Sequence, residues 1–121
     1  MKGRDWVWLR DKCRFRWSQE TLDVFQDNEE RLILDSARGF TLDLKARLVL
    51  RDGRVLVSFD EIESFAIEVR ETSRVGDTYK LILARVGKCD IVIGDTKDQL
   101  NCSRLAARMS ALTGKRVVAR Q

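Results

Sequence analysis

The sequence contains no histidine and no proline among its 121 residues. Histidine is the side chain that most readily changes charge near neutral pH, and it is the commonest metal ligand. Its absence excludes nucleophiles activated by histidine and every zinc or iron site that requires an imidazole. Chemistry based on carboxylates, lysines or a borrowed cofactor stays open. Since no other motif for catalysis or metal binding stands out, we predict no catalytic residue, no cofactor and no metal site.

Cysteine is also scarce. Cys13, Cys89 and Cys102 are odd in number and widely spaced, which fits neither a disulfide framework nor a Cys-x-x-Cys metal or redox motif. No apolar run approaches the ~20 residues that cross a bilayer. The stretch from Met1 to Arg16 lacks the apolar core and cleavage site of a secretory signal. We therefore expect reduced thiols, no transmembrane segment and a cytoplasmic location.

The composition is that of one packed domain, with 44% apolar and 35% charged residues. The net charge of +4 is unevenly distributed. Residues 1–17 hold six basic and two acidic side chains, and residues 97–121 hold six basic and one acidic. Residues 18–96 hold 11 basic and 16 acidic side chains. Such a layout is typical of a dipolar surface, or of two basic ends that form one patch.

Short segments with the two-residue period of strands follow one another along most of the chain. The clearest pair is 47–50 and 55–59, because Asp52-Gly53 between two apolar runs strongly favours a hairpin. Residues 18–28 fit either a short helix or a strand, and we favour a strand. The other predicted strands are 6–9, 13–17, 31–34, 40–44, 62–71, 79–86 and 89–94.

The period changes near the end of the chain. Thr96 followed by Gln99 fits the start of a helix with a capping box, and Gly114 fits its left-handed C-terminal cap. Between these positions the apolar residues fall on one helical face. They are Cys102, Leu105, Ala106, Met109 and Leu112. We predict one amphipathic helix at about 97–113 that covers the strands before it.

The hairpin is followed by Val57-Ser58-Phe59-Asp60-Glu61-Ile62, then by strands to Ile93 and the closing helix. This order resembles the pleckstrin-homology-like domains of bacteria, over roughly residues 31–114. The resemblance implies a mainly β fold, an antiparallel barrel or roll capped by the helix at about 97–113. It also implies binding of peptides, proteins or phospholipid head groups rather than catalysis. We do not extend lipid binding from that family to this chain, because the basic residues near the N-terminus do not reproduce a phosphoinositide motif.

We expect a single domain over residues 1–121. Residues 1–30 would supply N-terminal strands or decoration, residues 31–114 the barrel and helix, and residues 115–121 a basic tail.

All three tryptophans lie in the first 17 residues, interleaved with arginine and lysine. Tryptophan and arginine together suit interface anchoring, nucleobase stacking or a membrane surface. An ordinary strand pair with buried aromatics and solvated arginines is the alternative. Because residues 6–9 are apolar on both faces, we favour a protein contact, including a homodimer. The predicted interaction surface comprises Trp6, Trp8, Arg10, Lys12, Arg14, Arg16 and Trp17.

Two other patterns favour structural roles. Asp60, Glu61 and Glu63 fit a solvated acidic rim better than a cation site or an acid–base pair. This rim could also pair with a basic end of a neighbouring molecule. Thr113-Gly114-Lys115 resembles the tail of a phosphate loop, but it follows a helix instead of preceding one, so a helix cap is the better interpretation.

The sequence therefore predicts a non-catalytic binding or assembly module whose partner is a protein, either another copy or a different chain. One alternative is a binder of anionic surfaces, either phospholipid head groups or nucleic acid, through the basic N-terminal residues. A histidine-free enzyme is the third hypothesis.

Overall fold

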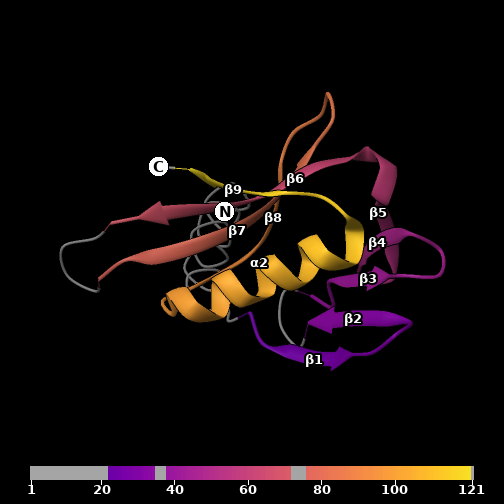
Figure 1. Cartoon of the computed structure of the whole chain (residues 1–121), viewed down its shortest axis with the longest axis horizontal. Coiled ribbons are helices and arrows are strands. Elements are labelled where there is room, and N and C mark those ends of the chain that lie inside the picture. The colour runs from indigo at the N-terminus through magenta and orange to yellow at the C-terminus, as the bar shows by residue number, and fades with distance from the viewer. Residues whose placement is uncertain (1–21, 35–37, 72–75, 121) are drawn as a thin grey trace, which may run out of the picture.

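The computed structural model describes residues 22–34, 38–71 and 76–120, which form two β-sheets and one C-terminal helix (Figure 1). The predicted mainly β fold with a closing helix is confirmed. The elements are β1 (Val24–Asp27), β2 (Arg31–Leu34), β3 (Thr41–Asp43), β4 (Leu48–Arg51), β5 (Arg54–Ser58), the 3-10 turn η1 (Phe59–Glu61), β6 (Ile62–Arg70), β7 (Thr78–Arg85), β8 (Ile91–Thr96), α2 (Gln99–Thr113) and β9 (Val117–Arg120).

The first sheet is an antiparallel meander in the order β1-β2-β3-β4-β5. Its last hairpin turns at Asp52 and Gly53, whose φ angles are 54° and 75°. Positive φ at both central residues is the geometry that two-residue hairpins require, and aspartate and glycine tolerate it well. The hairpin predicted from Asp52-Gly53 is confirmed. The ambiguous stretch at residues 18–28 contains a strand, β1, within its described part.

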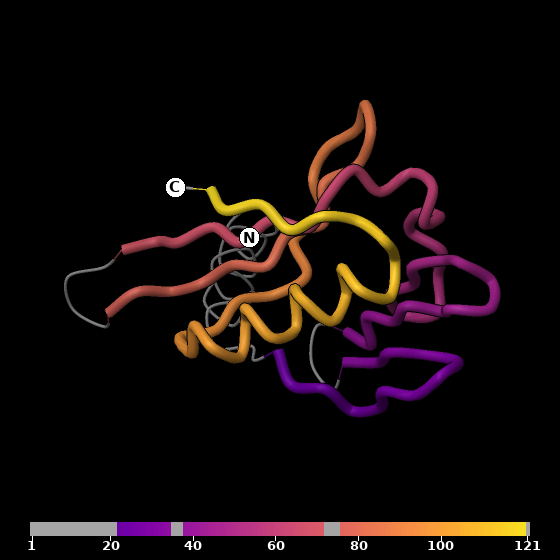
Figure 2. The backbone as a smooth tube through the Cα atoms, viewed as in Figure 1, coloured from indigo at the N-terminus to yellow at the C-terminus, as the bar shows by residue number. Residues whose placement is uncertain are grey.

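The second sheet has the order β8-β7-β6-β9. β6 and β7 form a long antiparallel hairpin, and β9 returns after α2 to pair with β6 in parallel. Figure 2 shows this return of the chain from the end of the helix along β6. From the sequence we expected only a basic tail here, so β9 was not predicted. The available signal was the pair of β-branched residues Val117 and Val118 directly after the helix cap.

The described strands do not close into a barrel, which corrects the barrel that we expected. Consecutive strands β5 and β6 lie in different sheets because η1 turns the chain between them. The Glu61 carboxylate accepts hydrogen bonds from the backbone N–H of Ser58 at 3.0 Å and from its hydroxyl at 3.1 Å. At β8, Arg51 of the first sheet donates to the carbonyls of Val92 and Ile93 at 2.8 and 3.1 Å. The Arg51 side chain of β4 thus links the two sheets without any strand pairing between them.

α2 has defined caps at both ends. Its N-cap is Asp98 rather than Thr96: the Asp98 carboxylate accepts from the N–H groups of Leu100 and Asn101 at 3.0 and 3.2 Å. Thr96 supports the cap, since its hydroxyl oxygen accepts from the Asp98 N–H at 3.1 Å. Gly114 adopts the predicted left-handed conformation, with φ of 76°, and donates to a carbonyl of the last turn. Residues 113–115 therefore end a helix, as predicted.

One hydrophobic core joins both sheets to the predicted face of α2. The Cys102 thiol is fully buried there, and burial raises its pKa to about 11, so it remains a neutral core side chain. Cys89 is exposed. The core comprises Leu22, Leu32, Leu34, Phe40, Leu42, Val49, Val57, Phe59, Ile62, Phe65, Leu81, Leu83, Ile93, Cys102, Leu105, Ala106 and Met109, with Leu112 packed against it.

Candidate interaction surface

The interaction surface predicted from the sequence lies outside the described residues. This applies to every member, namely Trp6, Trp8, Arg10, Lys12, Arg14, Arg16 and Trp17.

Within the described residues, the strand edges are the surfaces best suited to bind another chain. An edge strand carries a row of unpaired N–H and C=O groups, and natural proteins commonly blunt such edges with bulges. Each of β1, β5 and β8 contains an extra residue relative to its neighbour: Phe25, Leu56 and Ile93 respectively. β9 pairs with β6 over four residues without any shift in register. β9 is thus the one regular edge among the four that the described strands provide.

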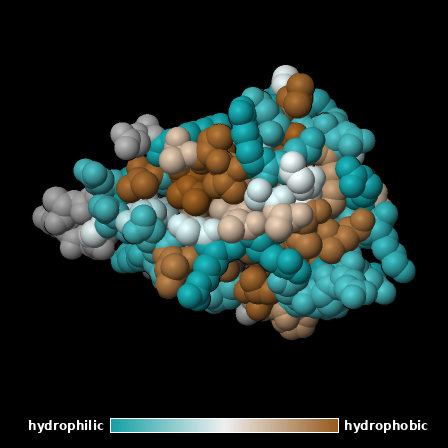
Figure 3. Space-filling model, in the orientation of Figure 1, coloured by the Kyte–Doolittle hydropathy of each residue, from teal (hydrophilic) through white to brown (hydrophobic). Residues whose placement is uncertain are grey.

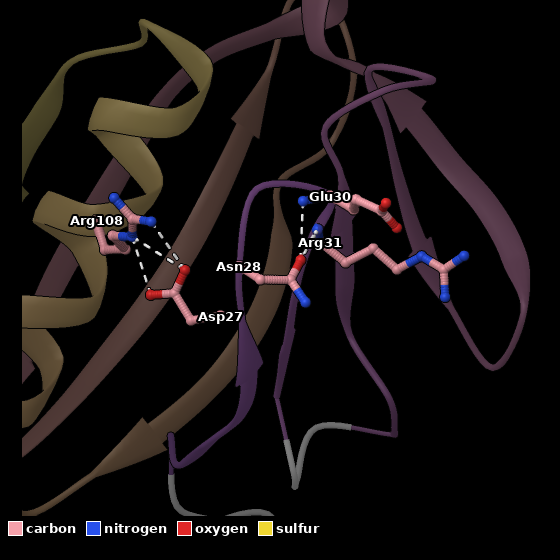
Figure 4. Close-up of polar contacts among 5 residues, drawn as sticks. All are labelled: Asp27, Asn28, Glu30, Arg31 and Arg108. Atoms are coloured by element: carbon pink, nitrogen blue, oxygen red, sulfur yellow. Dashed lines mark hydrogen bonds and ion pairs between the residues drawn. The ribbon is translucent and has the colours of Figure 1, made fainter.

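The β1 edge combines exposed apolar side chains with a distorted backbone. Phe25 is 68% exposed and Val24 is 47% exposed. At the end of the strand, the Asp27 carboxylate accepts two hydrogen bonds from Arg108 of α2, with Nε–Oδ2 and Nη2–Oδ1 distances of 2.9 Å (Figure 4). This hydrogen-bonded pair raises the pKa of Arg108. Side-chain contacts thus hold β1 against the helix.

The turn after β1 is held by Asn28. Its side-chain oxygen accepts from the backbone N–H groups of Glu30 and Arg31 at 2.8 and 3.0 Å, as Figure 4 shows. An asparagine in this arrangement fixes a tight turn locally. The backbone of this turn is therefore held by the Asn28 side chain.

The backbone of β9 has one side in the sheet and one side facing outward. The N–H of Phe65 donates to the carbonyl of Arg116 at 2.9 Å, and Phe65 is aligned with Val117. In a parallel ladder, a residue bonds to the two residues flanking its aligned partner. The backbone groups of Arg116 and Val118 therefore point to β6. Those of Val117 and Ala119 point away from the sheet.

The same two residues carry exposed apolar side chains. Val117 is 38% exposed and Ala119 is also exposed. Val117 lies on the face of the sheet that packs on α2, because its aligned partner Phe65 belongs to the core. Figure 3 shows apolar atoms gathered where β9 lies. β9 thus presents backbone hydrogen-bonding groups and apolar side chains at the same positions.

The charges around β9 differ between its two ends. Arg116, at the start, is exposed. Arg120, at the other end, donates to the Asp90 carboxylate at 2.7 Å. This hydrogen bond raises the pKa of Arg120, and the nearby carboxylates of Glu68 and Glu63 act in the same direction. The far end of β9 is therefore rich in negative charge despite its arginine.

The acidic cluster near η1 is exposed, as the sequence predicted for Asp60, Glu61 and Glu63. Asp60 is 3.3 Å from the guanidinium of Arg47. Glu61 caps the turn, and its hydrogen bonds to Ser58 hold the pKa of its carboxyl below the ordinary value. In the part of the chain that the structure describes, no group of three or more histidine, cysteine, aspartate or glutamate residues could hold a metal ion.

Comparison with known proteins places the chain in no established family. No family model, no curated protein and no solved structure matches it. The helix of the described residues is too short to cross a membrane.

Proposed function

We propose that this chain is a non-catalytic binding module that contacts other proteins by accepting an extended strand along β9. The observation that carries the proposal is the regular backbone of β9 beside three bulged edges. Strand addition draws its affinity from backbone hydrogen bonds and its specificity from the alternate side chains. Val117 and Ala119 can supply both kinds of contact, since their backbone groups point outward and their side chains are exposed.

We also propose kinship with the pleckstrin-homology-like domains. Two mainly antiparallel sheets followed by one helix support it. The pattern that suggested the resemblance ends at the helix, so β9 is additional to it. Members of that family that bind peptides fit a module of this kind.

A titration with designed peptides tests the proposed function. The probe is a synthetic eight-residue peptide of alternating valine and threonine with lysine at its N-terminus and glutamate at its C-terminus, added to the full chain labelled with ¹⁵N. In an antiparallel pairing the glutamate would approach Arg116 and Lys115 at the start of β9, and the lysine would approach Asp90 and Glu68 at its end. We expect the largest shifts in the amide signals of Val117 and Ala119. The same peptide with two of its threonines replaced by proline is the matched control, and it should bind more weakly because it lacks two backbone N–H donors.

The proposal would be wrong if neither peptide moved the β9 amide signals at millimolar concentration and the chain also showed no self-association. Shifts confined to β1 or β5 would also contradict it, because they would place the binding edge elsewhere.

A further inference from the structure

We infer that the strand accepted by β9 is β9 of a second copy, paired antiparallel across a two-fold axis at Val118. The inference rests on the proposed function and names its partner. Two four-stranded sheets would then join into one continuous sheet of eight strands. Cyclic dimers of this kind are the commonest soluble oligomers, and their interface uses the same patch on both copies.

The register of β9 suits this pairing. A two-fold axis at Val118 places Val117 opposite the partner's Ala119, and Ala119 opposite the partner's Val117. Both residues point their N–H and C=O groups outward, because the ladder to β6 uses the residues between them. In an antiparallel pair, two opposite residues whose N–H and C=O groups point toward each other exchange two hydrogen bonds. The dimer therefore gains four backbone hydrogen bonds without disturbing either sheet.

The side chains on the helix-facing side also match. In an antiparallel pair, opposite residues share one face of the sheet and their Cβ atoms lie about 5 Å apart. Val117, which is 38% exposed, would cover the partner's exposed Ala119. On the other face, the half-buried Val118 would meet its own copy at the axis. Each apolar side chain that β9 leaves accessible thus finds an apolar neighbour.

Charge is the feature that favours a second copy most specifically. The two-fold axis places Arg116 opposite the partner's Arg120, which alone would be repulsive. Arg120, however, is bound to Asp90 at 2.7 Å, and Glu63 and Glu68 also act on it. Asp90 neutralises Arg120, and the carboxylates of Glu63 and Glu68 add further negative charge near this end of β9. Arg116 is exposed and would supply the compensating charge.

The experiment is a concentration series of the full chain by sedimentation velocity, from micromolar to millimolar. We expect the mass to rise from the 14.0 kDa of one chain toward twice that value. The Ala119→Pro variant should keep the melting temperature within a few degrees, because the proline removes only an outward N–H. It deletes two of the four bonds in the dimer and should weaken association roughly ten- to hundredfold.

A charge variant keeps the test independent of any effect of proline on folding. Arg116→Glu adds an acidic group beside the partner's Asp90 and Glu68, so it should weaken the dimer, and more strongly at low salt. Arg104→Glu is the matched control, since Arg104 is exposed on α2. This substitution should leave the dissociation constant of the dimer unchanged. An unchanged dissociation constant for Arg116→Glu would contradict the inference, because residue 116 would then not lie beside the partner's Arg120 and its carboxylates.

Two results separate the inference from the function on which it rests. If the chain stays monomeric at millimolar concentration while the valine–threonine peptide shifts the β9 amide signals, the second copy is ruled out as the partner and the strand-binding function stands. A dimer whose affinity is unchanged in folded Ala119→Pro overturns the inference as well, because association would then use another surface.

Discussion

β1 and β9 are both four-residue strands at the outer edge of a sheet, yet they differ in what they offer another chain. β1 has the more exposed apolar side chain, with Phe25 at 68% against 38% for Val117. Its backbone, however, contains a bulge at Phe25 and is tied to α2 through Asp27 and Arg108. β9 has no bulge in the described residues, although its last residue, Arg120, also forms an ion pair, with Asp90.

Exposed apolar area alone would therefore favour β1, whereas the regularity of the backbone favours β9. Strand addition needs regularly spaced N–H and C=O groups, and one extra residue disrupts that spacing. The bulge turns Phe25 toward solvent and breaks the register at the same point. Val117 exposes less apolar surface but lies in a regular ladder.

The largest expected effect comes from Phe65→Ala, which tests whether both edges depend on one core. Phe65 is fully buried and is aligned with both Leu83 and Val117. Truncating a buried phenylalanine costs about 3–5 kcal/mol. We expect a much lower urea midpoint, measured by far-UV circular dichroism. Val55→Ala is the control, because Val55 is 58% exposed, and it should change stability by less than about 0.5 kcal/mol. Equal midpoints for the two variants would refute a shared core.

A proline pair tests which side of β9 faces the sheet. Val118→Pro removes the N–H that the parallel ladder assigns to the carbonyl of Phe65, and an unsatisfied buried acceptor costs about 1–3 kcal/mol. Ala119→Pro removes only an outward N–H and should cost less. Thermal unfolding of the two monomeric variants at micromolar concentration gives the comparison. The reverse order of stability would place the outward groups at Val118 and remove the basis of the account.

Arg108→Gln tests how β1 is held. The substitution removes the paired hydrogen bonds to Asp27. Because the pair is partly exposed, we expect only a small loss of global stability. Amide exchange should become faster in β1 and stay unchanged in β9. Equal acceleration in the two strands would show that Arg108 supports the whole fold rather than one edge.

The smallest effect concerns pH and the turn that separates the two sheets. The pKa of Glu61 lies below its ordinary value of 4.5 because its ionised form accepts hydrogen bonds from Ser58. The stabilisation is therefore complete above pH 4.5 and is lost as the pH falls through the lower folded pKa. Glu61→Gln should flatten this part of the curve of melting temperature against pH. An identical acid slope in the variant would show that the carboxylate does not stabilise η1.

The sequence could predict the features that are encoded locally. Asp52-Gly53 requires two residues with positive φ, and Gly114 requires one, so the hairpin and the helix end follow from single positions. The buried face of α2 follows from its 3.6-residue period. The spacing of Thr96 and Gln99 fits a capping box and predicts a start at Thr96, whereas the hydrogen bonds identify Asp98 as the N-cap.

The remaining features depend on contacts distant in sequence. β9 pairs with β6, about fifty residues earlier, and only two of its residues are β-branched, so no period was visible. The single extra residues at Phe25, Leu56 and Ile93 leave no mark on an apolar pattern. The contact that links the two sheets through Arg51 of β4 and the carbonyls of β8 is polar, so hydrophobic periodicity does not report it. The predicted surface at residues 6–17 remains a prediction.

Amide hydrogen exchange across β9, measured by NMR at two protein concentrations, tests the central claim most directly. At micromolar concentration, the N–H groups of Val117 and Ala119 should exchange nearly as fast as in an unfolded chain, while that of Val118 is protected. At millimolar concentration, Val117 and Ala119 should gain protection together. Protection of both amides at the lowest concentration would contradict an open edge. Lack of protection at the highest concentration would also contradict the account if added peptide failed to protect them.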